Sequence, residues 1–265
     1  MFQMLKLLLL IGAATSALAT AQGPAELAQK VAAAMETNSE KARAYAYRQH
    51  QITVRMDKNG KEIDRNSKTW DVIGLEGSRY RKLVERDDKP LPPREAEKQE
   101  QAMRAEAAKR RADRSAGRRL FSTSYSLSIP YRTLSRVYDL TLSGEEEIGG
   151  RAVFVLKGTP KASQNFTARE REAANYTIRL WVEKGSGYPV RTAMKVITDK
   201  SRMRKGTTLQ REDFQSEDGT WLPRAGEISF VLKVVGTFTL WGVSAETFSE
   251  FKKFQVDSKM TVEDR

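Results

Sequence analysis

The sequence predicts a mainly β protein with helical caps. Strand-like runs, in which apolar and polar residues alternate, are separated by short turns that contain glycine. Only two segments have helical character, one near the N-terminus and one in the middle of the chain. Neighbouring strands joined by short turns pair antiparallel, so we expect an antiparallel meander. The 265 residues are enough for one large β domain or two small ones.

The first 21 residues have the pattern of a secretory signal peptide. Lys6 precedes an apolar run from Leu7 to about Leu18, which is shorter than the roughly 20 residues needed to span a bilayer as an anchor. Small residues follow, and we expect cleavage near Ala21. The chain has no cysteine, so a lipoprotein anchor at the cleavage point is excluded. We therefore expect a soluble protein exported to the periplasm.

The composition is basic and offers little to a metal ion. Lys and Arg number 46 against 34 Asp and Glu, a net charge of +12. An exported protein with this charge is attracted to anionic membrane surfaces, although the charge can also serve solubility alone. No nucleic-acid-binding motif is present, and export argues against such a partner. With one histidine and no cysteine, we expect no metal site and no cofactor.

The first half of the chain predicts one helix and three strands. Pro24 suits a first helical turn, and Leu27, Val31 and Met35 repeat along one face of the segment 23–38. Strand patterns follow, and Asn59-Gly60 is a strong hairpin signal between the first two. The predicted strands are 44–56, 62–73 and 78–86.

A charged insert at 92–119 interrupts the strands. Acidic residues lie near its start and basic residues near its end, an arrangement that complements a helix dipole. We predict a helix over 93–114, with a disordered tether as the alternative because its apolar residues are almost all alanine. The following residues, 120–136, predict either a loop or short irregular elements.

The second half predicts further strands with one apolar face. In "LWVEKGSGYPVRTAMKV" and the residues just before it, apolar side chains alternate with Arg179, Glu183, Arg191 and Lys195. The predicted strands are 136–147, 151–158, 176–183, 188–198, 207–215, 220–224 and 226–241, with a last strand or edge beyond residue 250. The tryptophans lie in or beside these strands, where core packing is the expectation and an interface role the alternative.

The two predicted helices bring little side-chain volume to cover such a sheet, because they are rich in alanine. Protein interiors are densely packed and voids are costly. Either the sheet closes and fills itself with aromatic side chains, or it stays partly open around a hydrophobic cavity. The residues alone leave both possibilities open.

Three phrases resemble a known family. "YDLTLSGEEEIGGRAVFVLKGTPK" (138–161), "LWVEKGSGYPVR" (180–191) and "SEFKKFQV" (249–256) are similar to segments of the periplasmic outer-membrane lipoprotein-sorting proteins, the LolA/LolB-like superfamily. The order of signal peptide, helix, meander and helical insert is similar too. The resemblance covers most of the mature chain.

This resemblance implies an antiparallel unclosed β-barrel, a half-barrel, as one domain over 22–265 with a helical insert at 92–119. It implies lipoprotein sorting and outer-membrane biogenesis, with an acyl chain of a lipoprotein or lipid in a hydrophobic cavity and the 93–114 helix in its lid. An inner-membrane donor and an outer-membrane acceptor would be partners. The residues expected to line the cavity are Ile178, Leu180, Val182, Val190, Met194, Val196, Phe230 and Leu232.

No catalytic constellation is evident, and we predict that the protein is not an enzyme. His50 lies in a strand of mixed pattern, and the acidic clusters are typical of solvated turns. The main hypothesis is a periplasmic lipid carrier. The alternative is a non-catalytic envelope adaptor that docks through the basic helix, around Arg110 to Arg119.

Overall fold

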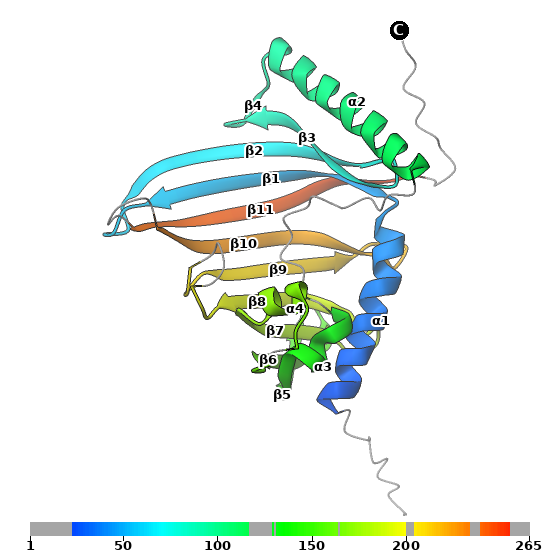
Figure 1. Cartoon of the computed structure of the whole chain (residues 1–265), viewed down its shortest axis with the longest axis vertical. Helices are drawn as coiled ribbons and strands as arrows, with labels where there is room; N and C mark the ends of the chain where they lie inside the picture. The colour runs from blue at the N-terminus through cyan, green and yellow to red at the C-terminus, as the bar shows by residue number, and fades with distance from the viewer. Residues whose placement is uncertain are drawn as a thin grey trace, which may run out of the picture.

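The protein folds around one eleven-stranded antiparallel sheet (Figure 1). The computed structural model describes residues 23–116, 129, 131–163, 165–199, 204–233 and 239–254. The strand order is β4-β3-β2-β1-β11-β10-β9-β8-β7-β6-β5, so β4 and β5 form the two edges and the sheet is not closed. The predicted unclosed antiparallel barrel, with an N-terminal and an inserted helix, is confirmed.

The strands are β1 (Tyr45–Met56), β2 (Glu62–Leu75), β3 (Ser78–Arg86), β4 (Lys89–Pro90), β5 (Tyr138–Ile148), β6 (Arg151–Pro160), β7 (Tyr176–Glu183), β8 (Pro189–Val196), β9 (Thr208–Gln215), β10 (Trp221–Lys233) and β11 (Thr239–Lys253). The helices are α1 (Pro24–Ala42), α2 (Pro93–Ser115), α3 (Leu134–Val137) and α4 (Ala168–Ala173), with a 3-10 turn, η1 (Tyr131–Thr133). None of the described helices is both long and apolar enough to cross a membrane.

Most predicted elements are present, and the errors concern the last strands. The bounds of the predicted strands 220–224 and 226–241 are wrong, because β10 continues without a break through a bulge between Pro223 and Ala225. The predicted 226–241 strand also combined the end of β10 with the start of β11. The signal peptide and the chain after residue 254, where a last strand was expected, lie outside the described residues.

The pairing of β1 with β11 joins two meanders. β1 to β4 follow one another on one side of this pair, and β11 back to β5 follow on the other. The two strands pair from Tyr45 opposite Lys253 to Met56 opposite Trp241, with one irregularity near Ala46. This contact between the two ends of the fold makes one sheet out of two.

Both edges of the sheet are irregular. β4 has only two residues, and one of them is Pro90, which has no N–H to donate. β5 contains a bulge between Leu142 and Glu145, where Gly144 adopts a φ of +121°. The glutamates that follow the bulge, Glu145 to Glu147, are exposed. Neither edge therefore presents a long flat row of backbone groups.

Helix α1 packs across one half of the sheet (Figure 1). Leu27 and Val31 are 2% and 0% exposed in a cluster with Leu180 and other residues of β5 to β8. Further along α1, the Asn38 side chain donates from Nδ2 to the Trp221 carbonyl at 2.9 Å and accepts from the Trp221 N–H at 2.7 Å. The apolar face of the helix and this double hydrogen bond fix α1 on the sheet.

Replacing Leu27 with Ala leaves a cavity under α1, and we expect it to lower the free energy of unfolding by about 2–5 kcal/mol. The matched control is Gln29→Ala, on the exposed side of the same helix, with an expected change within about 0.5 kcal/mol. Urea unfolding of both variants measures the difference. Equal stability of the two variants would contradict the packing of α1 described above.

Candidate functional site

Register divides the sheet into two faces, because residues paired directly across antiparallel strands point to the same side. Along β11, Gly242, Ser244, Glu246 and Phe248 are less exposed than the residues between them. We call the face that carries these four residues the inner face. Tyr131 of η1 packs against the α1 cluster and lies beside Arg211 and Thr192, which belong to the inner face. The helices η1 and α1 therefore lie on this side.

Of the eight residues expected to line a cavity, six are buried. Five of them pack in one cluster with α1 and α3: Ile178, Leu180, Val182, Met194 and Val196. Val190 packs in a neighbouring cluster with Trp181, Tyr188 and Trp221. This half of the inner face is filled by the protein's own side chains. Contact of these six residues with a ligand stays a prediction.

The remaining two expected residues belong to β10. Phe230 is partly buried and pairs with Gly242, and its ring occupies the space that a Cβ at position 242 would need. Any larger residue at 242 would displace this ring. Leu232 pairs with Leu240 in the backbone ladder, but its side chain lies outside the described part of the chain.

The inner face changes from polar to apolar across the sheet. Two rows of directly paired residues show this. One row, from β2 to β7, is Lys68, Gln51, Glu246, Gly226, Arg211, Thr192 and Leu180. The next row, from β2 to β7, is Asn66, Thr53, Ser244, Ile228, Leu209, Met194 and Ile178. The strands β1, β2 and β11 thus form a polar half, and β7 and β8 an apolar half.

The polar half contains a hydrogen-bonded band. Gln51 donates from Nε2 to the Ser244 hydroxyl at 2.6 Å, and the Thr53 hydroxyl lies 3.1 Å from the same oxygen. Gln49 is 7% exposed, and its side-chain amide has no hydrogen-bond partner among the described residues. The sequence did not reveal this band, because the pattern of β1 is mixed and did not indicate which of its residues face inward.

Between the two halves lies a strip of partly buried apolar side chains. Leu209, Ile228 and Phe230 occupy the inner face of β9 and β10. Leu209 packs against the α1 cluster from its edge, whereas Ile228 pairs directly with Ser244 of the polar band. We call Leu209, Ile228 and Phe230 the apolar strip. It is the part of the inner face where apolar surface borders polar groups.

An ionic group marks the boundary with η1. The Tyr188 hydroxyl donates to Asp213 Oδ2 at 2.6 Å, and Arg211 Nε donates to Asp213 Oδ1 at 2.7 Å. Burial raises the pKa of Tyr188 well above its ordinary value, and the Asp213 carboxylate adds to this effect. Tyr188 therefore stays a protonated donor, and the Asp213 charge is balanced by Arg211.

A hollow of about 620 Å³ lies over β6 to β10 and is lined mainly by residues of the opposite, outer face, although Ile178, Met194 and Leu209 also contribute to its lining. Its lining includes one directly paired row: Lys157, Arg179, Ala193, Gln210 and Glu227. Lys195 lines it from the next row, and within the described ranges neither Lys157 nor Lys195 has an ion-pair partner. The charged residues of the predicted hairpin thus lie on the outer face, as their alternation predicted.

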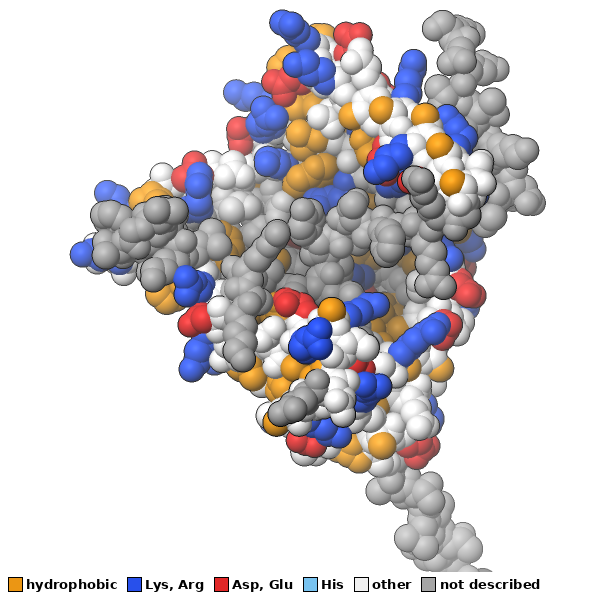
Figure 2. Space-filling view, viewed as in Figure 1, with side chains coloured by type: hydrophobic (Ala, Val, Ile, Leu, Met, Phe, Trp, Pro, Cys, Tyr) orange, Lys and Arg blue, Asp and Glu red, His pale blue; other side chains and the backbone are white. Residues whose placement is uncertain are grey.

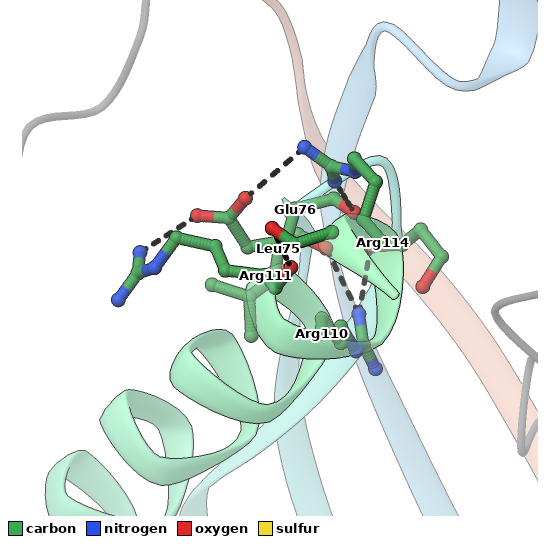
Figure 3. A network of polar contacts seen from close by, with 7 residues as sticks. Leu75, Glu76, Arg110, Arg111 and Arg114 are labelled. Carbon is green, nitrogen blue, oxygen red and sulfur yellow. Dashed lines mark hydrogen bonds and ion pairs between the residues drawn. The ribbon is translucent and has the colours of Figure 1, made fainter. Parts of the chain in front are cut away.

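The inserted helix α2 is clamped to the turn between β2 and β3 (Figure 3). Arg110 is 5% exposed, and its Nη1 donates to the carbonyls of Leu75 and Ser78 at 2.9 and 3.1 Å. Arg111 donates to the Glu76 carboxylate at 2.8 Å, and Arg114 donates to the Glu76 carbonyl. The helix prediction is confirmed, whereas a place for α2 in a lid stays a prediction.

Metal-binding chemistry finds no support in the described ranges, where no three His, Asp or Glu side chains are grouped as metal ligands. His50 Nδ1 lies 3.0 Å from the Thr69 hydroxyl, and its Nε2 lies 3.7 Å from Asp88. These contacts connect neighbouring strands and the loop beyond β3.

No protein-family model matches the chain. No curated protein matches it either. Among solved structures, a domain described as a "putative outer membrane lipoprotein-sorting protein domain" from Vibrio parahaemolyticus is 13% identical, over 88% of this chain and 95% of that one, with a TM-score of 0.41. A DUF1329 family protein from Desulfovibrio piger is 16% identical over 89% and 95%, with a TM-score of 0.40.

A LolA superfamily protein from Nitrosomonas europaea is 14% identical over 83% of this chain and 93% of that one, with a TM-score of 0.35. The family that the sequence resembles is therefore among the similar solved structures.

Replacing Arg110 with Ala removes the buried part of the clamp and leaves the Leu75 and Ser78 carbonyls without this side-chain donor. We expect the free energy of unfolding to fall by about 2–3 kcal/mol, since hydrogen bonds from a charged donor are lost. Hydrogen exchange of the α2 amides should also become faster. The control is Lys109→Ala, an exposed neighbour, and equal exchange in the two variants would contradict the clamp.

Proposed function

We propose that this protein is a periplasmic carrier that binds the acyl chain of a lipoprotein or another lipid non-covalently on the inner face of its open sheet. The observation that carries the proposal is the apolar strip of Leu209, Ile228 and Phe230. These side chains remain partly exposed on a sheet whose neighbouring half is already packed under α1. An apolar ligand would cover them.

The energetics suit reversible carriage. Burying each CH₂ group contributes about 0.8 kcal/mol, and a single acyl chain supports only marginal, reversible binding to a membrane. A carrier needs affinity of this order, because it has to take the lipid from one membrane and deliver it to another. No covalent step and no catalytic group is required.

The exposed surface supports contact with anionic membranes. Trp241 and Ile63 are 47% and 53% exposed, and both lie near the end of the sheet that carries the β1–β2 turn. Lys58 and Lys61 are exposed in that same turn. Figure 2 shows Lys and Arg side chains scattered over the visible face, with fewer acidic ones between them. Amphipathic tryptophan and cationic side chains suit the head-group region of a bilayer.

The contacts of α2 weaken the alternative of an adaptor that docks through its basic helix. Arg110 is buried against the sheet, and Arg111 and Arg114 both contact Glu76. The arginines around 110 that such an adaptor would present are therefore engaged within the molecule. Residues 117–119, which complete the proposed docking group, lie outside the described residues.

Placing a polar amide in the apolar strip should reduce lipid uptake. We expect Ile228→Gln to bind a fluorescent fatty acid at least fivefold more weakly, because the amide must be desolvated when the chain binds. The matched control is Val243→Gln, on the outer face of the adjacent strand β11. Titration of the full chain measures both. Wild-type protein that takes up no fatty acid, and carries no lipid in native mass spectrometry after purification from the periplasm, would refute the carrier.

Replacing Trp241 with Ala should weaken binding to anionic phosphatidylglycerol vesicles, since the indole no longer enters the head-group region. The control is Phe254→Ala, an apolar residue 42% exposed at the other end of β11. Vesicle co-sedimentation at low and high salt is the measurement, and binding of all three proteins should fall as salt rises. A larger loss for Phe254→Ala would place the membrane contact at the opposite end.

A further inference from the structure

We infer that the carried lipid bears an anionic head group, and that this head group binds the polar half of the inner face at Gln51, Ser244 and Lys68. The inference rests on the proposed function, because it assigns the second part of the same ligand. The apolar strip would hold the acyl chain, and the polar half of β1, β2 and β11 would hold the head.

The register places the two surfaces side by side. Ile228 of the apolar strip pairs directly with Ser244 of the polar band, and adjacent strands lie about 4.8 Å apart. A ligand that crosses from β10 to β11 therefore passes from apolar to hydrogen-bonding surface within one strand spacing. A plain hydrocarbon would match only the first surface, whereas a lipid with a polar head matches both.

Gln49 extends the polar band. On β1, Gln49 lies two residues before Gln51 and on the same face. Its side chain is 7% exposed, and its amide is not among the buried polar atoms that lack a partner in the described part of the chain. The amide therefore still reaches solvent, and a ligand oxygen in the polar half would accept a hydrogen bond from it in place of water.

The charges of the polar half favour an anion. Three arginines of the inner face are already paired with acids: Arg55 with Asp64, Arg86 with Glu95 and Arg211 with Asp213. Lys68 is exposed and has no ion-pair partner in the described part of the chain. Arg81 pairs with Val72 and places its guanidinium 4.0 Å from the Trp70 ring centroid. Against these two cations stands one carboxylate, Glu246.

A phosphate diester fits this set of groups. It carries one negative charge for Lys68 or Arg81, and its oxygens accept hydrogen bonds from the Gln49 and Gln51 amides. Charge-assisted hydrogen bonds of this kind are stronger than neutral ones. In a single binding event, the acyl chain would then lie on the apolar strip and the phosphate on the polar band.

The test compares four ligands on the full chain by calorimetry. Dihexanoyl-phosphatidylglycerol has chains and an anionic head, dihexanoylglycerol has the chains alone, and glycerol 3-phosphate and inorganic phosphate have no chain. The variant is Lys68→Gln, and the matched control is Lys195→Gln, an exposed lysine on the outer face. We expect Lys68→Gln to weaken phosphatidylglycerol binding about tenfold and leave dihexanoylglycerol binding unchanged. Glycerol 3-phosphate and inorganic phosphate, which have no acyl chain, should not bind measurably.

A second variant, Gln51→Leu with Ser244→Ala, removes the hydrogen-bonding band and keeps most of its shape. It should lower the preference for phosphatidylglycerol over dihexanoylglycerol, while circular dichroism confirms folding.

If wild-type protein binds both lipids equally and Lys68→Gln changes neither affinity, the head-group site is refuted and the proposal of a carrier stands. A loss in Lys195→Gln instead would move the anion to the outer hollow and refute the site. Tight binding of inorganic phosphate would also refute the head-group site, since the acyl chains of the lipid would then be dispensable for binding. Failure of every lipid to bind would refute the carrier itself.

Discussion

The pairing of β1 with β11 is the constraint on which the rest of the molecule depends. The two strands come from opposite ends of the described chain, and they pair from Tyr45 to Met56. Without this ladder, the short meander of β1 to β4 and the long one of β5 to β11 would be separate sheets. Such non-local pairing has a large loop-closure cost, which the many contacts formed afterwards offset. The continuous inner face, with its two halves, exists only because β1 pairs with β11.

The two halves have different sources of stability. Under α1, apolar side chains such as Val31 and Leu180 exclude water almost completely, and the hydrophobic effect dominates. On β1 and β11, the inner face is held instead by backbone ladders and by side-chain hydrogen bonds such as that of Gln51 with Ser244. A surface of the second kind loses little when a ligand replaces water on it. The same sheet thus combines a permanent core with a surface that can exchange its contacts.

Sequence reasoning found the elements more reliably than the faces. Short turns and alternation located β7 and β8, and the dipole pattern located α2, because both signals are local. In β1 the mixed pattern did not indicate a face, and the structure places Ile52 and Val54 outward and Gln49 and Gln51 inward. Which face becomes the interior is decided by what packs on it, and α1 covers only the far half of the sheet. The Arg110 clamp was equally hidden, because its acceptors are backbone carbonyls.

The two irregular edges have a consequence for contacts between molecules of this protein. An unclosed sheet offers two borders on which another chain could add a strand and start a growing assembly. Here one border is a two-residue strand ending in Pro90, and the other is bent at Gly144 and lined by glutamates. Both discourage strand addition from a second molecule. The sheet can therefore stay unclosed at both edges without pairing with a strand of a second molecule.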